Sequence, residues 1–125
     1  MREQLRDALL VSSSGDNEFT AELKLSPDFV GFKGHFPGTP VLPGICIIAA
    51  VIVSAESVLG KDLKMKYLNA AKFFSPVEPG DRMVITGTLK TESAPYSVRA
   101  QITRDQERIA KVSLQVDPVT SDAQD

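Results

Sequence analysis

The residues best suited to chemistry lie in one short stretch, GHFPGTPVLPGICIIAA, which covers residues 34–50. It holds His35, the only histidine of the chain, and continues directly into a dense apolar segment. An imidazole titrates near neutral pH, so His35 is a candidate acid–base group. Pro43 and Gly44 open the apolar segment. A helix that begins there presents backbone N–H groups that can stabilise negative charge.

Few other groups near this stretch could act together with His35. Glu56 is the first carboxylate in the apolar segment, and it is a candidate catalytic residue. The favoured alternative for Glu56 is a structural role at a helix end. Cys46 is a weaker candidate, because no second base accompanies it, and a small buried thiol is the favoured interpretation. One cysteine and one histidine do not make the usual zinc ligand set, so we predict no metal site.

The apolar segment predicts one long helix over residues 44–59. Proline suits the first turn of a helix, and Gly60 stands where a C-cap glycine belongs. Periodicity alone does not separate buried strand from buried helix here, but a length of about four turns favours helix. Because the segment is apolar on nearly every side, we expect protein to surround it.

Strands are predicted on both sides of this helix. Residues 18–26 alternate apolar and polar side chains, and four further segments follow the helix at 63–77, 81–92, 96–104 and 108–116. Residues 2–14 carry leucines at helical spacing and predict a short amphipathic helix. This order is α+β, and such a sheet can bury the helix only by wrapping around it. We expect one domain over 1–117, a polar tail over 118–125 and a dimer, because a small curved sheet leaves an apolar edge.

Composition narrows the class of protein. The 125 residues are 42% hydrophobic and 24% charged with a formal net charge of −2, which suits a globular domain and argues against nucleic acid as the partner. The first residues do not resemble a signal peptide, and the longest apolar run is too short to cross a bilayer. A single cysteine rules out an internal disulfide and fits a reducing compartment. We therefore expect a soluble cytoplasmic protein.

Two motifs together carry a family resemblance. GHFPGTPVLPG, residues 34–44, resembles the signature loop of the hot-dog-fold (3R)-hydroxyacyl-[acyl carrier protein] dehydratases of fatty acid synthesis. KFFSPVEPGD, residues 72–81, is similar to a second segment of that family, K-F-x-x-P-V-x-P-G-D. The resemblance covers roughly residues 29–89. It implies a hot-dog fold, in which a curved antiparallel sheet wraps around one long central helix.

The resemblance also implies a chemistry and a set of roles. These enzymes eliminate water from a 3-hydroxyacyl thioester to give a trans-2-enoyl thioester, without a cofactor. By resemblance, His35 is the base, and the backbone N–H of Gly44 polarises the thioester carbonyl. Substrate-binding positions by the same resemblance are Phe32, Phe36, Gly38, Pro43, Ile45, Ile48, Ala49, Phe73 and Phe74, although core packing is the competing interpretation for the apolar side chains.

The chain departs from the family pattern at one position. The family places a Glu or Asp fourteen residues after the histidine, and this chain has Ala49 there. A methyl group neither gives nor takes a proton, and loss of a positioned acid or base typically costs about 10² to 10⁴ in rate. Glu56 lies seven residues further on, about 10.5 Å along a helix axis, which exceeds hydrogen-bond reach.

Three functions therefore stay open at the level of sequence. The first is a dehydratase whose missing acid is replaced by water, by Glu56 or by a partner chain. The second is a catalytically impaired acyl-thioester-binding subunit, which acts as a homodimer or as the partner of an active dehydratase. The third is a hot-dog thioesterase. The resemblance implies acyl carrier protein or coenzyme A as the acyl donor, and basic residues that could supply docking charge are Lys33, Lys64, Lys66, Lys72 and Arg82.

Overall fold

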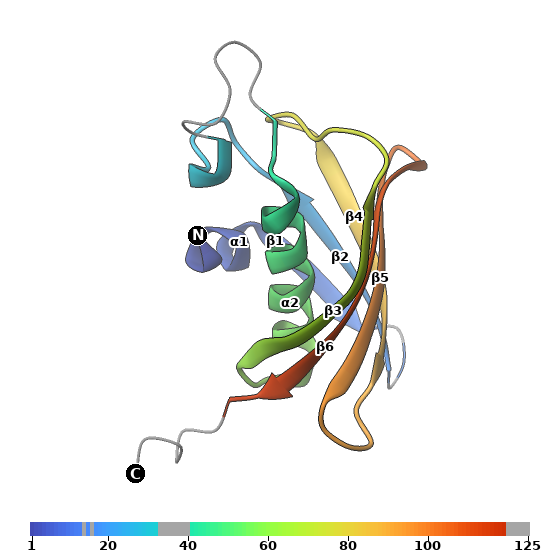
Figure 1. Cartoon of the computed structure of the whole chain (residues 1–125). Coiled ribbons are helices and arrows are strands. Elements are labelled where there is room, and N and C mark those ends of the chain that lie inside the picture. The colour runs from blue at the N-terminus through green and yellow to red at the C-terminus, as the bar shows by residue number, and fades with distance from the viewer. Residues whose placement is uncertain (14, 16, 33–40, 120–125) are drawn as a thin grey trace.

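The computed structural model describes residues 1–13, 15, 17–32 and 41–119. Two helices, one 3-10 turn and six strands follow in the order α1 (Arg2–Ala8), β1 (Leu9–Ser13), β2 (Glu18–Lys24), η1 (Val30–Phe32), α2 (Gly44–Leu59), β3 (Leu63–Phe73), β4 (Arg82–Lys90), β5 (Tyr96–Arg104) and β6 (Glu107–Pro118). The strands form one antiparallel sheet in the order β1-β2-β4-β5-β6-β3. Figure 1 shows the sheet curving around α2, with α1 on the other side of that helix. The predicted α+β arrangement is confirmed.

The boundaries of α2 agree with the sequence prediction. Pro43 is the N-cap residue in an extended conformation, and Gly60 is the C-cap residue with φ 66°. The N–H of Gly60 donates to the carbonyl of Glu56 at 2.8 Å, which closes the last turn. The β-branched residues of the segment do not prevent a helix, because the sheet buries most of its length.

The core lies between α2 and the concave face of the sheet. Every second residue of the central strands points to this face, and those residues are buried: Met83, Ile85, Leu89, Val98, Ala100, Ile102, Val112, Leu114 and Val116. One part of the helix is less covered than predicted. Ile45 is 70% exposed, and Ile48 and Ala49 are only partly buried. The N-terminal half of α2 therefore has one face that the sheet of its own chain does not cover.

The N-terminal segment differs from the prediction. The helix ends at Ala8, and Leu9–Ser13 form strand β1, which pairs with β2 from Leu9 opposite Leu23 to Ser13 opposite Phe19. The leucine spacing predicts a helix through Leu9 and Leu10, but the ladder to β2 satisfies the backbone of these residues instead. Leu5 is fully buried, so the short helix is held by the core.

Strand β3 lies at one end of the sheet and is exposed on both of its faces. Its pairing with β6 is interrupted between Met65 and Tyr67 and between Leu68 and Ala70. Each irregularity leaves one residue of β3 outside the regular pairing, as in a β-bulge. Among the helices of the described residues, none is long and apolar enough to cross a membrane.

Candidate active site

The start of α2 is packed directly against the end of β3. A Cβ atom built on Gly44 would lie 2.7 Å from Cζ and 2.9 Å from Cε2 of Phe73. A real side chain does not fit at such distances, so glycine at position 44 allows the Phe73 ring to lie against the first turn of the helix. Among the described residues, no side chain caps this end of the helix. The first N–H groups of a helix lack intrahelical partners, so the first turn of α2 can donate to an acceptor placed beside it.

An open cavity of about 340 Å³, a depression in the surface, lies beside this first turn. It is lined by Val41, Leu42, Gly44, Ile47, Phe73, Phe74, Ser75, Pro76 and Val77. The lining thus comes from both motif segments, and the N–H of Leu42 donates to the carbonyl of Val77 at 2.8 Å to join them. Three predicted site residues meet here, namely Gly44, Phe73 and Phe74. An apolar cavity at a helix N-terminus suits an acyl chain that carries a polar carbonyl.

The segment after β3 is held in place by Arg104, which the sequence analysis did not single out. Its guanidinium donates to the carbonyl of Pro76 at 2.8 Å and to Asp81 Oδ2 at 2.7 Å. It also donates to Glu107 Oε1 at 2.7 Å, and Ser75 Oγ donates to Glu107 Oε2 at 3.0 Å. Hydrogen bonding to Arg104 and Ser75 lowers the pKa of Glu107 below its ordinary value. Arg104 is the last residue of the strand predicted over 96–104, but nothing in the neighbouring sequence indicates that it contacts residues 76–81.

The remaining predicted substrate residues are not gathered in this cavity. Phe32 is buried against Phe29, with ring centroids 6.0 Å apart in an edge-to-face arrangement, and so belongs to the core. Pro43 caps the helix, and Ile45, Ile48 and Ala49 follow it on α2 without lining the cavity. The other three predicted positions lie outside the described residues: His35, Phe36 and Gly38.

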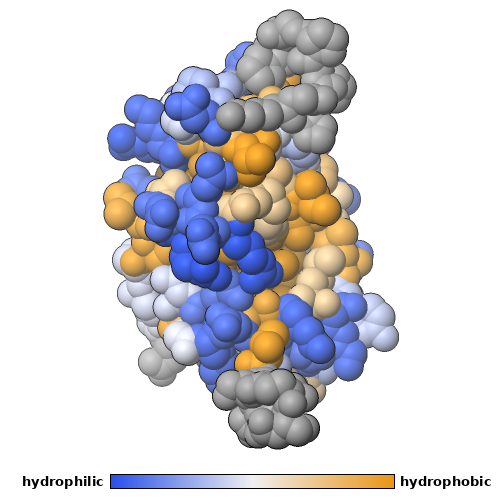
Figure 2. All heavy atoms as spheres, turned by 90° about the vertical axis from the view of Figure 1, so that its left-hand side faces the viewer, coloured by the Kyte–Doolittle hydropathy of each residue, from blue (hydrophilic) through white to orange (hydrophobic). Residues whose placement is uncertain are grey.

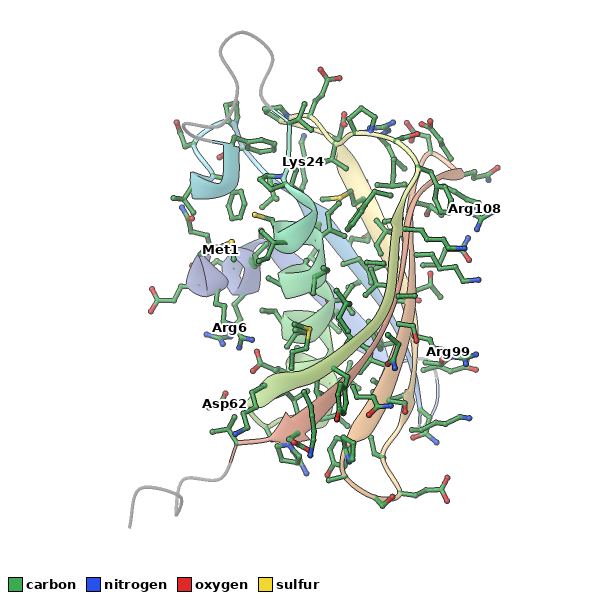
Figure 3. The ribbon with its side chains drawn as sticks, viewed as in Figure 1. Met1, Arg6, Lys24, Asp62, Arg99 and Arg108 are labelled. Atoms are coloured by element: carbon green, nitrogen blue, oxygen red, sulfur yellow. The ribbon has the colours of Figure 1, made fainter. Side chains whose placement is uncertain are left out.

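Glu56 lies at the opposite end of α2 from Gly44, twelve residues or about 18 Å along the axis. Its carboxylate is buried, and Oε2 accepts from the N–H of Leu63 at 2.8 Å and from Arg2 Nη1 at 3.0 Å. Oε1 lies 3.5 Å from Arg6 Nη2, an ionic contact without hydrogen-bond geometry. Figure 3 shows Arg6 extending from α1 beside the C-terminal half of α2. These contacts tie α1, α2 and β3 together, which supports the structural interpretation of Glu56.

The thiol of Cys46 is buried in the first turns of α2. Burial raises its pKa, although the positive N-terminus of the chain opposes this in part. Cys46 Sγ donates to Met1 Sδ at 3.4 Å. A neutral, enclosed thiol is a poor nucleophile. Within the described ranges, no three His, Cys, Asp or Glu side chains are grouped so as to hold a metal ion.

Comparison with protein families identifies the class to which the chain belongs. The family model described as "ApeI-like: ApeI dehydratase" matches residues 11–113, which is most of the chain. The chain belongs to this family of dehydratases. The resemblance inferred from the two motifs is thereby confirmed at the level of the family.

Curated relatives agree with this family. The chain is 33% identical over 91 residues to the 3-hydroxyacyl-[acyl-carrier-protein] dehydratase FabZ of Polynucleobacter necessarius, a match that covers 66% of this chain and 61% of that protein. It is 38% identical over 77 residues to the FabZ protein of Chlamydia trachomatis, which covers 54% of this chain and 48% of the relative. The chain thus spans about three fifths of the length of the first of these relatives.

Solved structures confirm the predicted hot-dog fold. The dehydratase heterocomplex ApeI:P from Xenorhabdus doucetiae matches with a TM-score of 0.76 at 22% identity, over 86% of this chain and 93% of that one. A hypothetical thioesterase with coenzyme A from Streptococcus pneumoniae matches with a TM-score of 0.69 at 12% identity, over 90% and 87%. At such identities these likenesses bear on the fold alone.

Proposed function

We propose that the protein removes water from a (3R)-hydroxyacyl thioester, carried by acyl carrier protein or coenzyme A, to give a trans-2-enoyl thioester. The observation that carries this proposal is the apolar cavity at the N-terminus of α2, built from the two segments that resemble the dehydratases. Membership of the dehydratase family supports the same reaction. The thioesterase alternative has no comparable support.

In this proposal the thioester carbonyl lies against the N–H of Gly44. The helix N-terminus stabilises the charge that develops on the carbonyl oxygen as the C2 proton is removed. His35 takes that proton, the C2 electron pair forms the double bond to C3, and the C3 hydroxyl leaves with a proton as water. Phe73 and Phe74 would contact the acyl chain. No redox cofactor enters, because elimination of water changes no oxidation state.

The leaving hydroxyl also needs a proton donor. Ala49 has no group to donate it, and Glu56 is about 18 Å from Gly44 and engaged with Arg2 and Leu63. We infer that water, the protonated His35 or a second subunit supplies this proton. The protein would then act in the cytoplasm as a dimer, with a second copy or with a partner dehydratase subunit. The uncovered face of α2 at Ile45 supports an assembly.

The test is a hydration and dehydration assay with short 2-enoyl and 3-hydroxyacyl thioesters. Wild-type protein would be compared with His35→Ala and Ala49→Glu, with Val30→Ala as the control because Val30 is exposed ahead of the loop. Turnover that falls by about 10² or more in His35→Ala and persists in Val30→Ala supports the proposal. A silent wild type that gains turnover in Ala49→Glu identifies an acyl-binding subunit that has lost its acid. Turnover unchanged in His35→Ala would refute the proposed base.

A further inference from the structure

The outer face of the sheet, which is directed away from α2, has an open depression of about 630 Å³ over β4, β5 and β6. Its polar lining includes two rows of paired residues, with Thr88, Arg99 and Ser113 in one row and Thr86, Gln101 and Lys111 in the other. The residues between the rows, Gly87, Ala100 and Val112, are buried and face the core, because side chains alternate along a strand. The floor of this outer depression is therefore strand backbone, and its walls are polar side chains.

The outer depression is positively charged. Arg99 and Lys111 line it, and no Asp or Glu of the described residues is among those that do. Arg99 lies diagonally across from Lys111, because it pairs with Ser113, two residues further along β6. Diagonal neighbours of an antiparallel pair are roughly 7–8 Å apart, a distance that long side chains can span. Lys72 of β3 pairs directly with Lys111 and adds a third positive charge beside the depression.

These three cations have no partner of opposite charge in the described part of the chain. Arg99, Lys111 and Lys72 are exposed, and none of them forms an ion pair there. Glu18 is in the same row as Arg99, but Thr88 stands between them, so their backbones are two strand spacings, roughly 10 Å, apart. Like charges directly opposite in a ladder are destabilising, so an anion bound beside Lys111 would remove a repulsion.

The donors of the outer depression suit phosphoryl oxygens. Arg99 carries a planar fork of N–H donors that matches two oxygens of one phosphate, and Lys111 carries a compact ammonium group. The hydroxyl groups of Thr88 and Ser113 flank Arg99, and the amide of Gln101 lies opposite Lys111. Among the described residues, no aromatic side chain lines the depression, so it offers no platform on which a nucleic acid base could stack.

The outer depression is separate from the cavity at the start of α2. Figure 3 shows Arg99 projecting from the sheet on the side away from that helix. The helix side of the molecule has hydrophobic surface next to a strongly hydrophilic area (Figure 2). Because the sheet and the core lie between the two, an acyl chain in the cavity at Gly44 does not contact Arg99.

We propose that the outer depression binds a free small molecule that carries two or more linked phosphoryl groups, with one group at Arg99 and the next at Lys111. The two cations are on neighbouring strands, so linked phosphoryl groups can contact both of them at once. Binding also relieves the repulsion between Lys111 and Lys72. This inference goes beyond the proposed function, and its readout is binding, so failure of the dehydration assay does not affect it.

The test is isothermal titration calorimetry of the whole protein with inorganic pyrophosphate at low salt. Arg99→Gln and Lys111→Gln should each weaken binding by about tenfold or more, because each removes a charge-assisted contact. Lys24→Gln is the matched control, because Lys24 is exposed on β2 and lies outside the depression. This control should bind like wild type, and all three variants should keep the wild-type urea midpoint. Added salt should weaken wild-type binding, because it screens exposed charges.

Three results would overturn the proposal. One is a wild-type protein that does not bind pyrophosphate at low salt. Another is a loss of binding in Lys24→Gln as large as in Arg99→Gln, which would mean that only net charge matters. The third is a wild-type protein that binds phosphatidylglycerol vesicles through Arg99 but does not bind pyrophosphate, which would assign this face to an anionic membrane surface.

Discussion

Replacing Glu56 by alanine is expected to destabilise the fold and to leave the chemistry of the site intact. The carboxylate accepts from the buried N–H of Leu63 at 2.8 Å, and a hydrogen bond to a charged group contributes about 1.5–3 kcal/mol. The contacts to Arg2 and Arg6 add less, because those side chains are 42% and 49% exposed, and such pairs contribute about 0–1 kcal/mol each. The sum predicts a loss of about 3 kcal/mol in the free energy of unfolding.

The assay is urea denaturation of wild type, Glu56→Ala and Glu56→Gln. Glutamine keeps an oxygen that can accept from Leu63 and removes only the charge, so its expected loss is about 1 kcal/mol. Both variants should turn over substrate at the wild-type rate when they are assayed at urea concentrations well below their unfolding midpoints. The result that would refute this reasoning is a Glu56→Ala protein as stable as wild type but without activity, since that would make Glu56 the missing acid.

Four further outcomes follow from the site and its supports. Gly44→Ala should lower turnover in the thioester assay with little loss of stability, because the new Cβ would displace the half-exposed Phe73 ring from the first turn of α2. If that clash is the cause, Gly44→Ala should lower turnover less in a Phe73→Ala background than in wild type. Arg104→Lys should lower the urea midpoint by the equivalent of about 1 kcal/mol, because lysine cannot donate to Pro76, Asp81 and Glu107 at the same time. The pKa of Glu107 is lower in the folded state than its ordinary value of 4.5, so the ionised carboxylate stabilises the fold above that pH. This stabilisation is lost as the pH falls through the folded-state pKa. On acidification the urea midpoint should therefore fall less steeply in Glu107→Gln than in wild type. Cys46 should react slowly with thiol reagents at neutral pH and rapidly after unfolding, because burial raises its pKa; a fast native reaction would contradict its placement in the core.

Several elements of the fold could be predicted from nearby residues. The start and end of α2 follow from Pro43 and Gly60, whose backbone preferences are local properties. The strands β4, β5 and β6 follow from alternation, because one face of each is buried. The two motif segments, residues 34–44 and 72–81, are likewise recognisable from their residues alone, and they indicate the family without any knowledge of the contact between them.

The site itself could be predicted only in part. The position of Gly44 at the helix start follows from the sequence, but the reason that it must be glycine is the Phe73 ring, which is twenty-nine residues away. The roles of His35 and Ala49 remain predictions, because His35 lies outside the described residues and Ala49 is known only as a partly buried helix residue. The role of Phe32 also stays a prediction, and its burial against Phe29 favours the competing interpretation of core packing.

Contacts between segments far apart in the sequence determined the features that local patterns could not predict. The helical spacing of Leu5, Leu9 and Leu10 is real, yet the helix stops at Ala8 because β2 offers a ladder to the residues that follow. Glu56 meets Arg2, fifty-four positions away, and Arg104 reaches back to Pro76, because the topology brings those segments together. The composition of β3 is visible in the sequence, but its place at the sheet edge is a property of strand order. Secondary-structure propensity depends on a few neighbouring residues, whereas strand order and long-range ion pairs depend on how the whole chain folds back on itself.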